Sequence, residues 1–153
     1  MPTDPQDTVD ALARLVRGEM AALSTYARAL EKFSGQPEEA TLRRIHGEHQ
    51  VAHDRLVDLL ADRGAPPPED VGAFGHLAWA VHRLSTWIND ELPIQLLQRG
   101  ERIGVHAYEQ ALDDPSLTEV RVPLRAHLDG CHLHVAMLQQ LREHVGEPLR
   151  PML

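Results

Sequence analysis

The chain has 153 residues, 42% of them hydrophobic, which is the size and apolar content expected of one globular domain with a buried core. Its formal net charge of −8 disfavours a protein that binds nucleic acid through phosphate contacts, and the lack of a long apolar run excludes a membrane span. The acidic N-terminus is unlike a signal peptide and the single cysteine, Cys131, cannot form an internal disulfide, so we predict one soluble, cytoplasmic domain over residues 1–153.

The first predicted element is a long amphipathic helix over residues 5–34. Asp4-Pro5 is a helix-start signal, because Asp caps the first turn and Pro suits the first helical position. Apolar residues recur at helical spacing along this segment, and no segment of the chain shows a sustained alternation with the period of a strand. One position of the core-facing stripe is acidic, Glu19, and an acidic residue is rarely buried unless it is paired.

A second helix is predicted over residues 37–63, after the break at Gly35-Gln36-Pro37. The short break means that this helix turns back antiparallel to the first one. Three consecutive core-facing positions in it are histidines, namely His46, His49 and His53. The second helix therefore brings imidazoles to the face that meets Glu19.

Residues 64–89 are too many for a hairpin turn, so we expect them to run the length of a helical bundle as a crossover. They open with a proline-rich stretch. We predict a shorter amphipathic helix over residues 73–88, which carry both tryptophans.

Two further long helices are predicted over residues 90–113 and 116–146. Ser116-x-x-Glu119 has the form of a capping box for the last helix. Pro123 lies inside that helix and is expected to bend it. The core-facing stripe of the last helix includes His127, Cys131 and His134.

The first and third helices contain related segments. Residues 17–30 read RGEMAALSTYARAL and residues 99–112 read RGERIGVHAYEQAL, so six of fourteen positions match. The alternative is chance resemblance between amphipathic helices, but a shared Glu-x6-Tyr on the buried face is less expected by chance than shared leucines. We therefore predict two helical hairpins related by a pseudo-twofold axis.

A helix rises about 1.5 Å per residue, so positions on two antiparallel helices can be matched by counting outward from the turn that connects them. This count places Glu19 beside His53 and within a turn of His49. The pseudo-twofold places Glu101 opposite His134 in the same way. Ionised glutamates in an apolar core are costly unless they are paired, and carboxylates and imidazoles from four helices suit a divalent ion. We predict a metal site with ligands drawn from one set: Glu19, His49, His53, Glu101 and His134.

Simpler interpretations stay open. A single core histidine is more often a hydrogen-bonded residue than a ligand, and either glutamate could pair with an arginine or a protonated histidine. Tyr26 and Tyr108 are expected to be packing residues whose hydroxyls are hydrogen-bonded. The sequence leaves open whether four further residues join the site: His46, His127, Cys131 and His132.

The chain resembles the ferritin-like superfamily, which includes the rubrerythrins, in the repeated Glu-x6-Tyr, the histidine-bearing second helix of each hairpin and the crossover. It resembles more closely an uncharacterised bacterial ferritin-like family in LLQRGERIGVHAYEQAL, in the segment from Ala52 to Leu56 and in the spacing from Gly75 to Trp87. The resemblance implies an all-α, four-helix bundle of two pseudo-twofold-related hairpins with a long crossover. We also expect a homodimer.

Di-iron members of that superfamily have a Glu on the first and third helices and Glu-x-x-His on the second and fourth. Glu19 and Glu101 match the first requirement. The second is not met, because Gln50 and Cys131 stand three residues before the histidines at positions 53 and 134. The resemblance therefore implies a histidine-richer site for zinc, iron or manganese rather than di-iron chemistry.

Two function classes compete. The first is a ferritin-like metal-binding protein, with an oxidoreductase or metal-handling role. The second is a non-catalytic helical bundle, with a stress or interaction role and no metal, in which the histidines form a polar hydrogen-bonded layer. A hydrolase has little support, because no serine or cysteine lies in a nucleophile motif. Whether the protein is an enzyme stays open.

Overall fold

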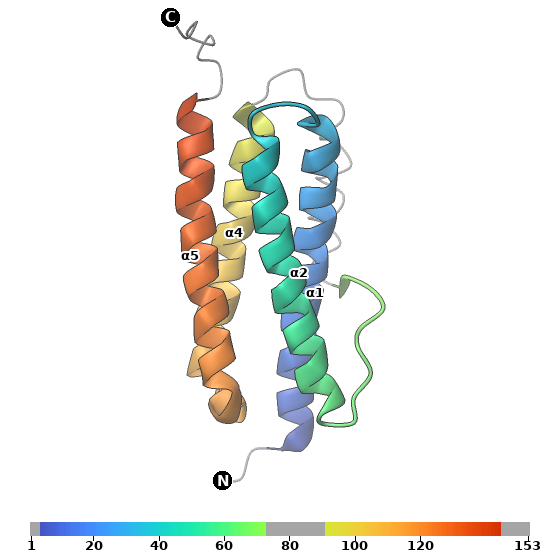
Figure 1. Cartoon of the computed structure of the whole chain (residues 1–153). Helices are drawn as coiled ribbons and strands as arrows, with labels where there is room; N and C mark the ends of the chain where they lie inside the picture. The colour runs from blue at the N-terminus through green and yellow to red at the C-terminus, as the bar shows by residue number, and fades with distance from the viewer. Residues whose placement is uncertain (1–3, 73–90, 145–153) are drawn as a thin grey trace, which may run out of the picture.

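The computed structural model describes residues 4–72 and 91–144, and the regular secondary structure in these ranges is entirely helical. Four long helices lie side by side as a bundle in this part of the chain (Figure 1). The helix predicted over residues 73–88 lies outside the described residues. None of the described helices combines the length and apolar character that crossing a membrane requires.

The described helices form two antiparallel hairpins. The first consists of α1 and α2, and the second consists of α4 and α5 joined through a short 3-10 helix, η3. The bounds are α1 Pro5–Lys32, α2 Glu39–Ala61, α4 Glu91–Asp113, η3 Pro115–Val120 and α5 Arg121–His144.

The start of α1 follows from its first residues, as the sequence predicts. The Asp4 side chain caps the helix by accepting a hydrogen bond of 2.9 Å from the backbone N–H of Gln6, and Pro5 is the first helical residue. The turn between α1 and α2 contains Gly35 at a φ of 75°, a left-handed conformation that suits glycine. The backbone N–H of Gly35 donates to the Glu39 carboxylate, which ties the turn to the start of α2.

The start of the second hairpin's last helix differs from the prediction. Residues from Pro115 to Val120 form η3, whose N-cap is Asp114, and α5 begins only at Arg121. Asp114 accepts from the backbone N–H of Ser116, while the buried Ser116 hydroxyl has no hydrogen-bond partner among the described residues. The expected capping box at Ser116 is therefore wrong. Pro123 is the third residue of α5, where the backbone N–H positions need no partner within the helix, so the proline falls in the first turn.

Two apolar clusters fill the bundle, one toward each end. One cluster is built around Leu12, Val16, Leu56, Leu60, Leu117 and Leu124. The other is built around Tyr26, Phe33, Leu42, Ile45, Leu97 and Leu138. The buried polar side chains of the described residues are Glu19, His49, Gln98, Glu101 and His134.

The two hairpins are each closely packed, α1 on α2 and α4 on α5. The hairpins meet each other mainly along α1 and α4 and less closely along α2 and α5. In Figure 1, α2 and α5 lie on the near side of the bundle and α1 and α4 behind them. The looser α2–α5 side leaves room near the buried polar residues.

The turn glycine and a helix glycine should respond oppositely to alanine. Gly35→Ala should lower the free energy of unfolding by about 1–2 kcal/mol, because a Cβ is strained at this positive φ. Gly47→Ala is the matched control in α2, where an added Cβ meets nothing within 4 Å. This substitution should raise the free energy of unfolding by up to about 1 kcal/mol. Urea denaturation of both variants checks this, and equal effects of the same sign would contradict it.

Candidate metal centre

Each long helix contributes one buried glutamate or histidine to the middle of the bundle. Glu19 comes from α1, His49 from α2, Glu101 from α4 and His134 from α5, and each is 3–5% exposed. These side chains are held between the two apolar clusters, so the water that would otherwise solvate them is largely excluded. Burial of this kind requires that the charges be paired with one another or with an ion.

The imidazole of His49 lies between the two glutamates. Its Nδ1 is 2.7 Å from Glu19 Oε2, and its Nε2 is 2.8 Å from Glu101 Oε1. Carboxylate oxygens accept hydrogen bonds, so both ring nitrogens can donate only when the ring is an imidazolium. In the metal-free protein this ring is the positive charge that links α1 to α4.

The pKa values of His49 and Glu101 reflect the same geometry. Burial alone would lower the pKa of His49, but hydrogen bonds to Glu101 and Glu19 raise it to about 10. Burial alone would raise the pKa of Glu101, but hydrogen bonds from His134 and His49 lower it to about 2. At neutral pH the carboxylate and the imidazolium are therefore both charged.

Two tyrosine hydroxyls complete the hydrogen bonding of the glutamates, in a reciprocal way. Tyr26 of α1 donates to Glu101 Oε1 of α4 at 2.6 Å, and Tyr108 of α4 donates to Glu19 Oε1 of α1 at 2.5 Å. Burial and the neighbouring carboxylates raise the pKa of both phenols well above the ordinary value, so both remain protonated donors. The expectation of packing residues with hydrogen-bonded hydroxyls is confirmed.

His134 lies between two other carboxylates. Its Nδ1 is 3.3 Å from Glu101 Oε2, and its Nε2 is 2.7 Å from Glu48 Oε2. The second oxygen of Glu48 accepts from Arg44 at 3.0 Å. Sequence reasoning missed Glu48, because Arg44 and Glu48 have the spacing of an ordinary surface ion pair on one helix.

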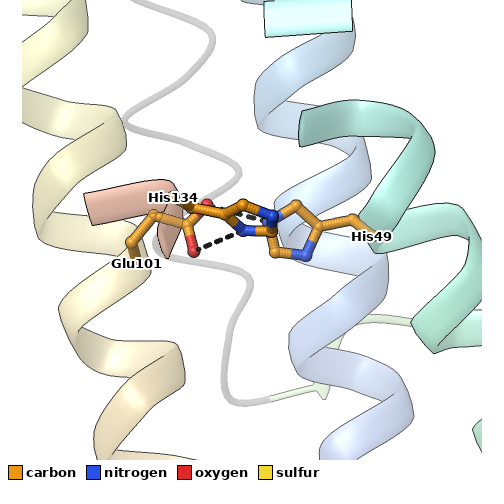
Figure 2. Close-up of side chains that lie close together, drawn as sticks. All are labelled: His49, Glu101 and His134. Atoms are coloured by element: carbon orange, nitrogen blue, oxygen red, sulfur yellow. Dashed lines mark hydrogen bonds and ion pairs between the residues drawn. The ribbon is translucent and has the colours of Figure 1, made fainter. Parts of the chain in front are cut away.

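Three of these side chains hold their ligand atoms close enough for a single ion. Ligand atoms of His49, Glu101 and His134 lie within 4.8 Å of one another. Figure 2 shows the three side chains converging from their separate helices. Two imidazole nitrogens and a carboxylate oxygen form a donor set that suits zinc, iron or manganese.

The structure brings together four of the five predicted ligands and leaves one out. His53 is half-buried, and its Nδ1 lies 3.0 Å from the exposed carboxylate of its neighbour Asp54. The reason is the rotation of α2 about its axis. Its buried face runs through Ile45, His49, Ala52 and Leu56, so His53 stands at the edge of this face rather than on it.

The residues left open at the sequence level are spread around the site. His46 is half-buried and His132 is exposed. Cys131 is buried, and burial raises the pKa of its thiol, which disfavours the thiolate that a metal would need. His127 is half-buried with its ring beside Tyr108, and its Nε2 has no hydrogen-bond partner among the described residues.

No protein-family model and no curated protein matches the chain. The chain is similar in structure to a conserved hypothetical protein, rv2844, from Mycobacterium tuberculosis, with a TM-score of 0.72. The two are 15% identical, and the match covers 91% of this chain and 99% of that chain. At this level of identity the likeness shows a shared helical-bundle fold alone.

The stability of the metal-free protein should depend on pH on both sides of a maximum. The folded-state pKa of His49, about 10, lies above its ordinary value of 6.5, so its contribution is complete below pH 6.5 and is lost as the pH rises toward 10. The pKa of Glu101, about 2, lies below its ordinary 4.5, so its contribution is complete above pH 4.5 and is lost as the pH falls toward 2.

Urea denaturation in the presence of a chelator should therefore give the largest free energy of unfolding between pH 4.5 and 6.5, as far as these two groups decide it. His49→Gln should flatten the alkaline side, because glutamine does not titrate. An alkaline side that is equally steep in wild type and variant would contradict the assignment.

Removing either tyrosine hydroxyl should destabilise the bundle. Tyr26→Phe and Tyr108→Phe should each cost about 1.5–3 kcal/mol, because each removes a hydrogen bond to a buried charged group. Thr25→Val is the control, since its hydroxyl donates to the neutral carbonyl of Ala21 and should cost only about 1 kcal/mol. Thermal or urea unfolding measures all three, and tyrosine effects no larger than the control would count against charged acceptors.

Proposed function

We propose that the chain is a ferritin-like protein that binds one divalent metal ion in the middle of the bundle. The ligands are His49, Glu101 and His134, with Glu19, a second carboxylate, as the fourth ligand beside His49. Zinc, iron and manganese are the candidate ions. The observation that carries the proposal is the buried convergence of two imidazoles and a carboxylate from three different helices.

The surroundings of these ligands support a metal role. A metal-bound histidine usually directs its other ring nitrogen to a carboxylate or carbonyl, which orients the ring. Glu48 occupies that position on His134. The tyrosine hydroxyls do the same for the carboxylates, since each glutamate has one oxygen held by a phenol of the other hairpin.

The reciprocal bonds also support the internal repeat. Tyr26 to Glu101 and Tyr108 to Glu19 are equivalent contacts if the two Glu-x6-Tyr segments are related by a pseudo-twofold axis. A two-hairpin bundle with this arrangement is what the ferritin-like resemblance implies. The homodimer and the crossover stay predictions of the sequence.

An ion at this site would supply positive charge to the two glutamates and a Lewis-acid centre. The protein's part is to hold the donor atoms and to exclude water with the apolar clusters, and binding of the ion releases the ring protons that it displaces. Because the imidazoles must be neutral to bind an ion, affinity should fall as the pH is lowered. The donor set has two fewer acidic ligands than four-carboxylate di-iron sites, so we propose metal binding without assigning a reaction.

The second candidate is a metal-free bundle in which His49 is itself the counter-charge. One observation favours it specifically. The imidazolium of His49 already donates to both Glu19 and Glu101, and no carboxylate oxygen of these two residues lacks a hydrogen-bond partner. In this form the polar layer is a structural element, and added metal has no effect on the melting temperature.

Elemental analysis of protein purified without chelator distinguishes the two candidates. The metal proposal expects one ion per chain in the wild type, and loss of stoichiometric metal in Glu101→Gln combined with His134→Gln. Glu48→Gln should weaken metal binding about 10- to 100-fold, because it removes the carboxylate behind a ligand.

His53→Gln is the matched control and should retain metal, since His53 faces Asp54 outside the cluster. Wild-type protein that takes up no zinc, iron or manganese, and whose melting temperature ignores all three, would overturn the metal proposal in favour of the second candidate.

A further inference from the structure

A cavity of about 200 Å³ lies between α2 and α5, directly beside the polar cluster. Three of the four central side chains line it, namely Glu19, His49 and His134. Its lining also includes Val51, which is 66% exposed, and Ala126, which is exposed as well. The hairpins pack less closely on this side, which is the near side of the bundle in Figure 1. The cavity therefore leads from solvent to the proposed metal ligands.

Glu48 lines the same cavity and lies between solvent and a buried ligand. Its side chain is 38% exposed, whereas that of His134, whose Nε2 is 2.7 Å from Glu48 Oε2, is only 4% exposed. Arg44 and His134 each engage one oxygen of Glu48. A carboxylate has about four lone-pair positions, so these two bonds leave Glu48 able to bind a cation. A cation that enters the cavity therefore meets this carboxylate before it reaches the histidine.

A second, smaller cavity reaches the cluster from the other side of the bundle, between α1 and α4. Its volume is about 60 Å³, and its walls are mainly aliphatic side chains and glycines, such as Leu15, Ala21 and Gly104. Among the described residues, the charged side chain that lines it outside the cluster is Arg14, which is exposed. Because like charges repel, a guanidinium there disfavours the approach of a cation.

The volumes of the two cavities also differ in what they allow an ion to keep. Space of about 10–15 Å³ of this kind is enough for one water molecule. The α2–α5 cavity can therefore hold more water beside an ion than the α1–α4 cavity can. Removing a charge from water costs several kcal/mol when nothing replaces the hydration. The wider cavity with a carboxylate in its wall is the easier path for a cation.

We propose that a divalent cation reaches the buried ligands through the α2–α5 cavity, with Glu48 as the first carboxylate that it meets. This inference rests on the proposed function, because it assigns the route to that same site. Along the route, oxygens of Glu48 and then the buried donor atoms replace the water that the ion gives up. Glu48 therefore affects how fast the ion enters, besides orienting the ring of His134.

The two charged residues at the outer part of the route should have opposite effects on the rate of uptake. Glu48→Gln should slow uptake about 10-fold, the lower end of the effect of electrostatic steering on association rates. Arg44→Gln should speed uptake by up to about 5-fold, the factor that corresponds to an exposed ion pair, because the guanidinium no longer competes for Glu48.

Stopped-flow mixing of zinc with the full-length, chelated protein measures uptake, followed by a chromogenic zinc indicator. Excess EDTA added to the zinc-loaded protein measures release. Gly130 lines the α2–α5 cavity, and an added Cβ there meets nothing within 4 Å. Gly130→Leu should slow uptake and release by the same factor, about 10-fold for a barrier raised by about 1.4 kcal/mol. The equilibrium affinity should not change, because an obstructed path alters neither end state.

Gly100→Leu is the matched control. Gly100 is half-buried like Gly130, lies in a helix, lines the α1–α4 cavity, and has nothing within 4 Å of an added Cβ. Both substitutions exchange a helical glycine for a good helix former, so their effects on helix stability should be similar. Gly100→Leu should leave the rates of uptake and release unchanged.

Stoichiometric zinc uptake with unchanged rates in Gly130→Leu would overturn the route and leave the metal site intact. Slower uptake and release in Gly100→Leu, with unchanged rates in Gly130→Leu, would place the route between α1 and α4 instead. Glu48→Gln that speeds release without slowing uptake would overturn the part assigned to Glu48 in the route. Wild-type protein that takes up no zinc, iron or manganese would overturn the proposed function and this inference with it.

Discussion

The interaction on which the rest of the bundle depends is the imidazole of His49 held between the carboxylates of Glu19 and Glu101. It joins the two hairpins through their middle, at the place where apolar packing is interrupted. Removing the ring would leave two buried negative charges facing each other without a counter-charge, which is among the costliest arrangements in a protein core. The apolar clusters on either side can pack only because this charge balance is met.

The acidic centre was predictable from the sequence, and its partners were predictable only in part. Glu19 and Glu101 interrupt otherwise apolar helical stripes, and this anomaly is visible without coordinates. The choice between His49 and His53 depends on how α2 is rotated about its axis, which neighbouring helices decide through the packing of Ile45 and Ala52. Glu48 could not be predicted, because its pairing with His134 crosses from one hairpin to the other.

Metal binding and the protonated state draw on the same atoms. The ring nitrogens that would bind an ion are those that donate to the glutamates in the metal-free protein. The fold therefore does not need an ion to satisfy the buried groups of this cluster, because the imidazolium of His49 already supplies a positive charge. This sets it apart from sites whose chains are unfolded without metal. The similarity of fold to the mycobacterial structure does not distinguish the metal-bound state from the protonated state, since it concerns the backbone alone.

The reciprocal tyrosine–glutamate bonds have a consequence for alignment. Amphipathic helices can slide along one another by a turn, about 5.4 Å, and still bury much of their apolar surface. Such a slide of α4 against α1 would separate both Tyr26 from Glu101 and Tyr108 from Glu19 at once, because the two bonds run in opposite directions between the same pair of helices. The two hydrogen bonds together therefore fix the axial alignment of α1 and α4. Alignments shifted by one helical turn would lose both bonds.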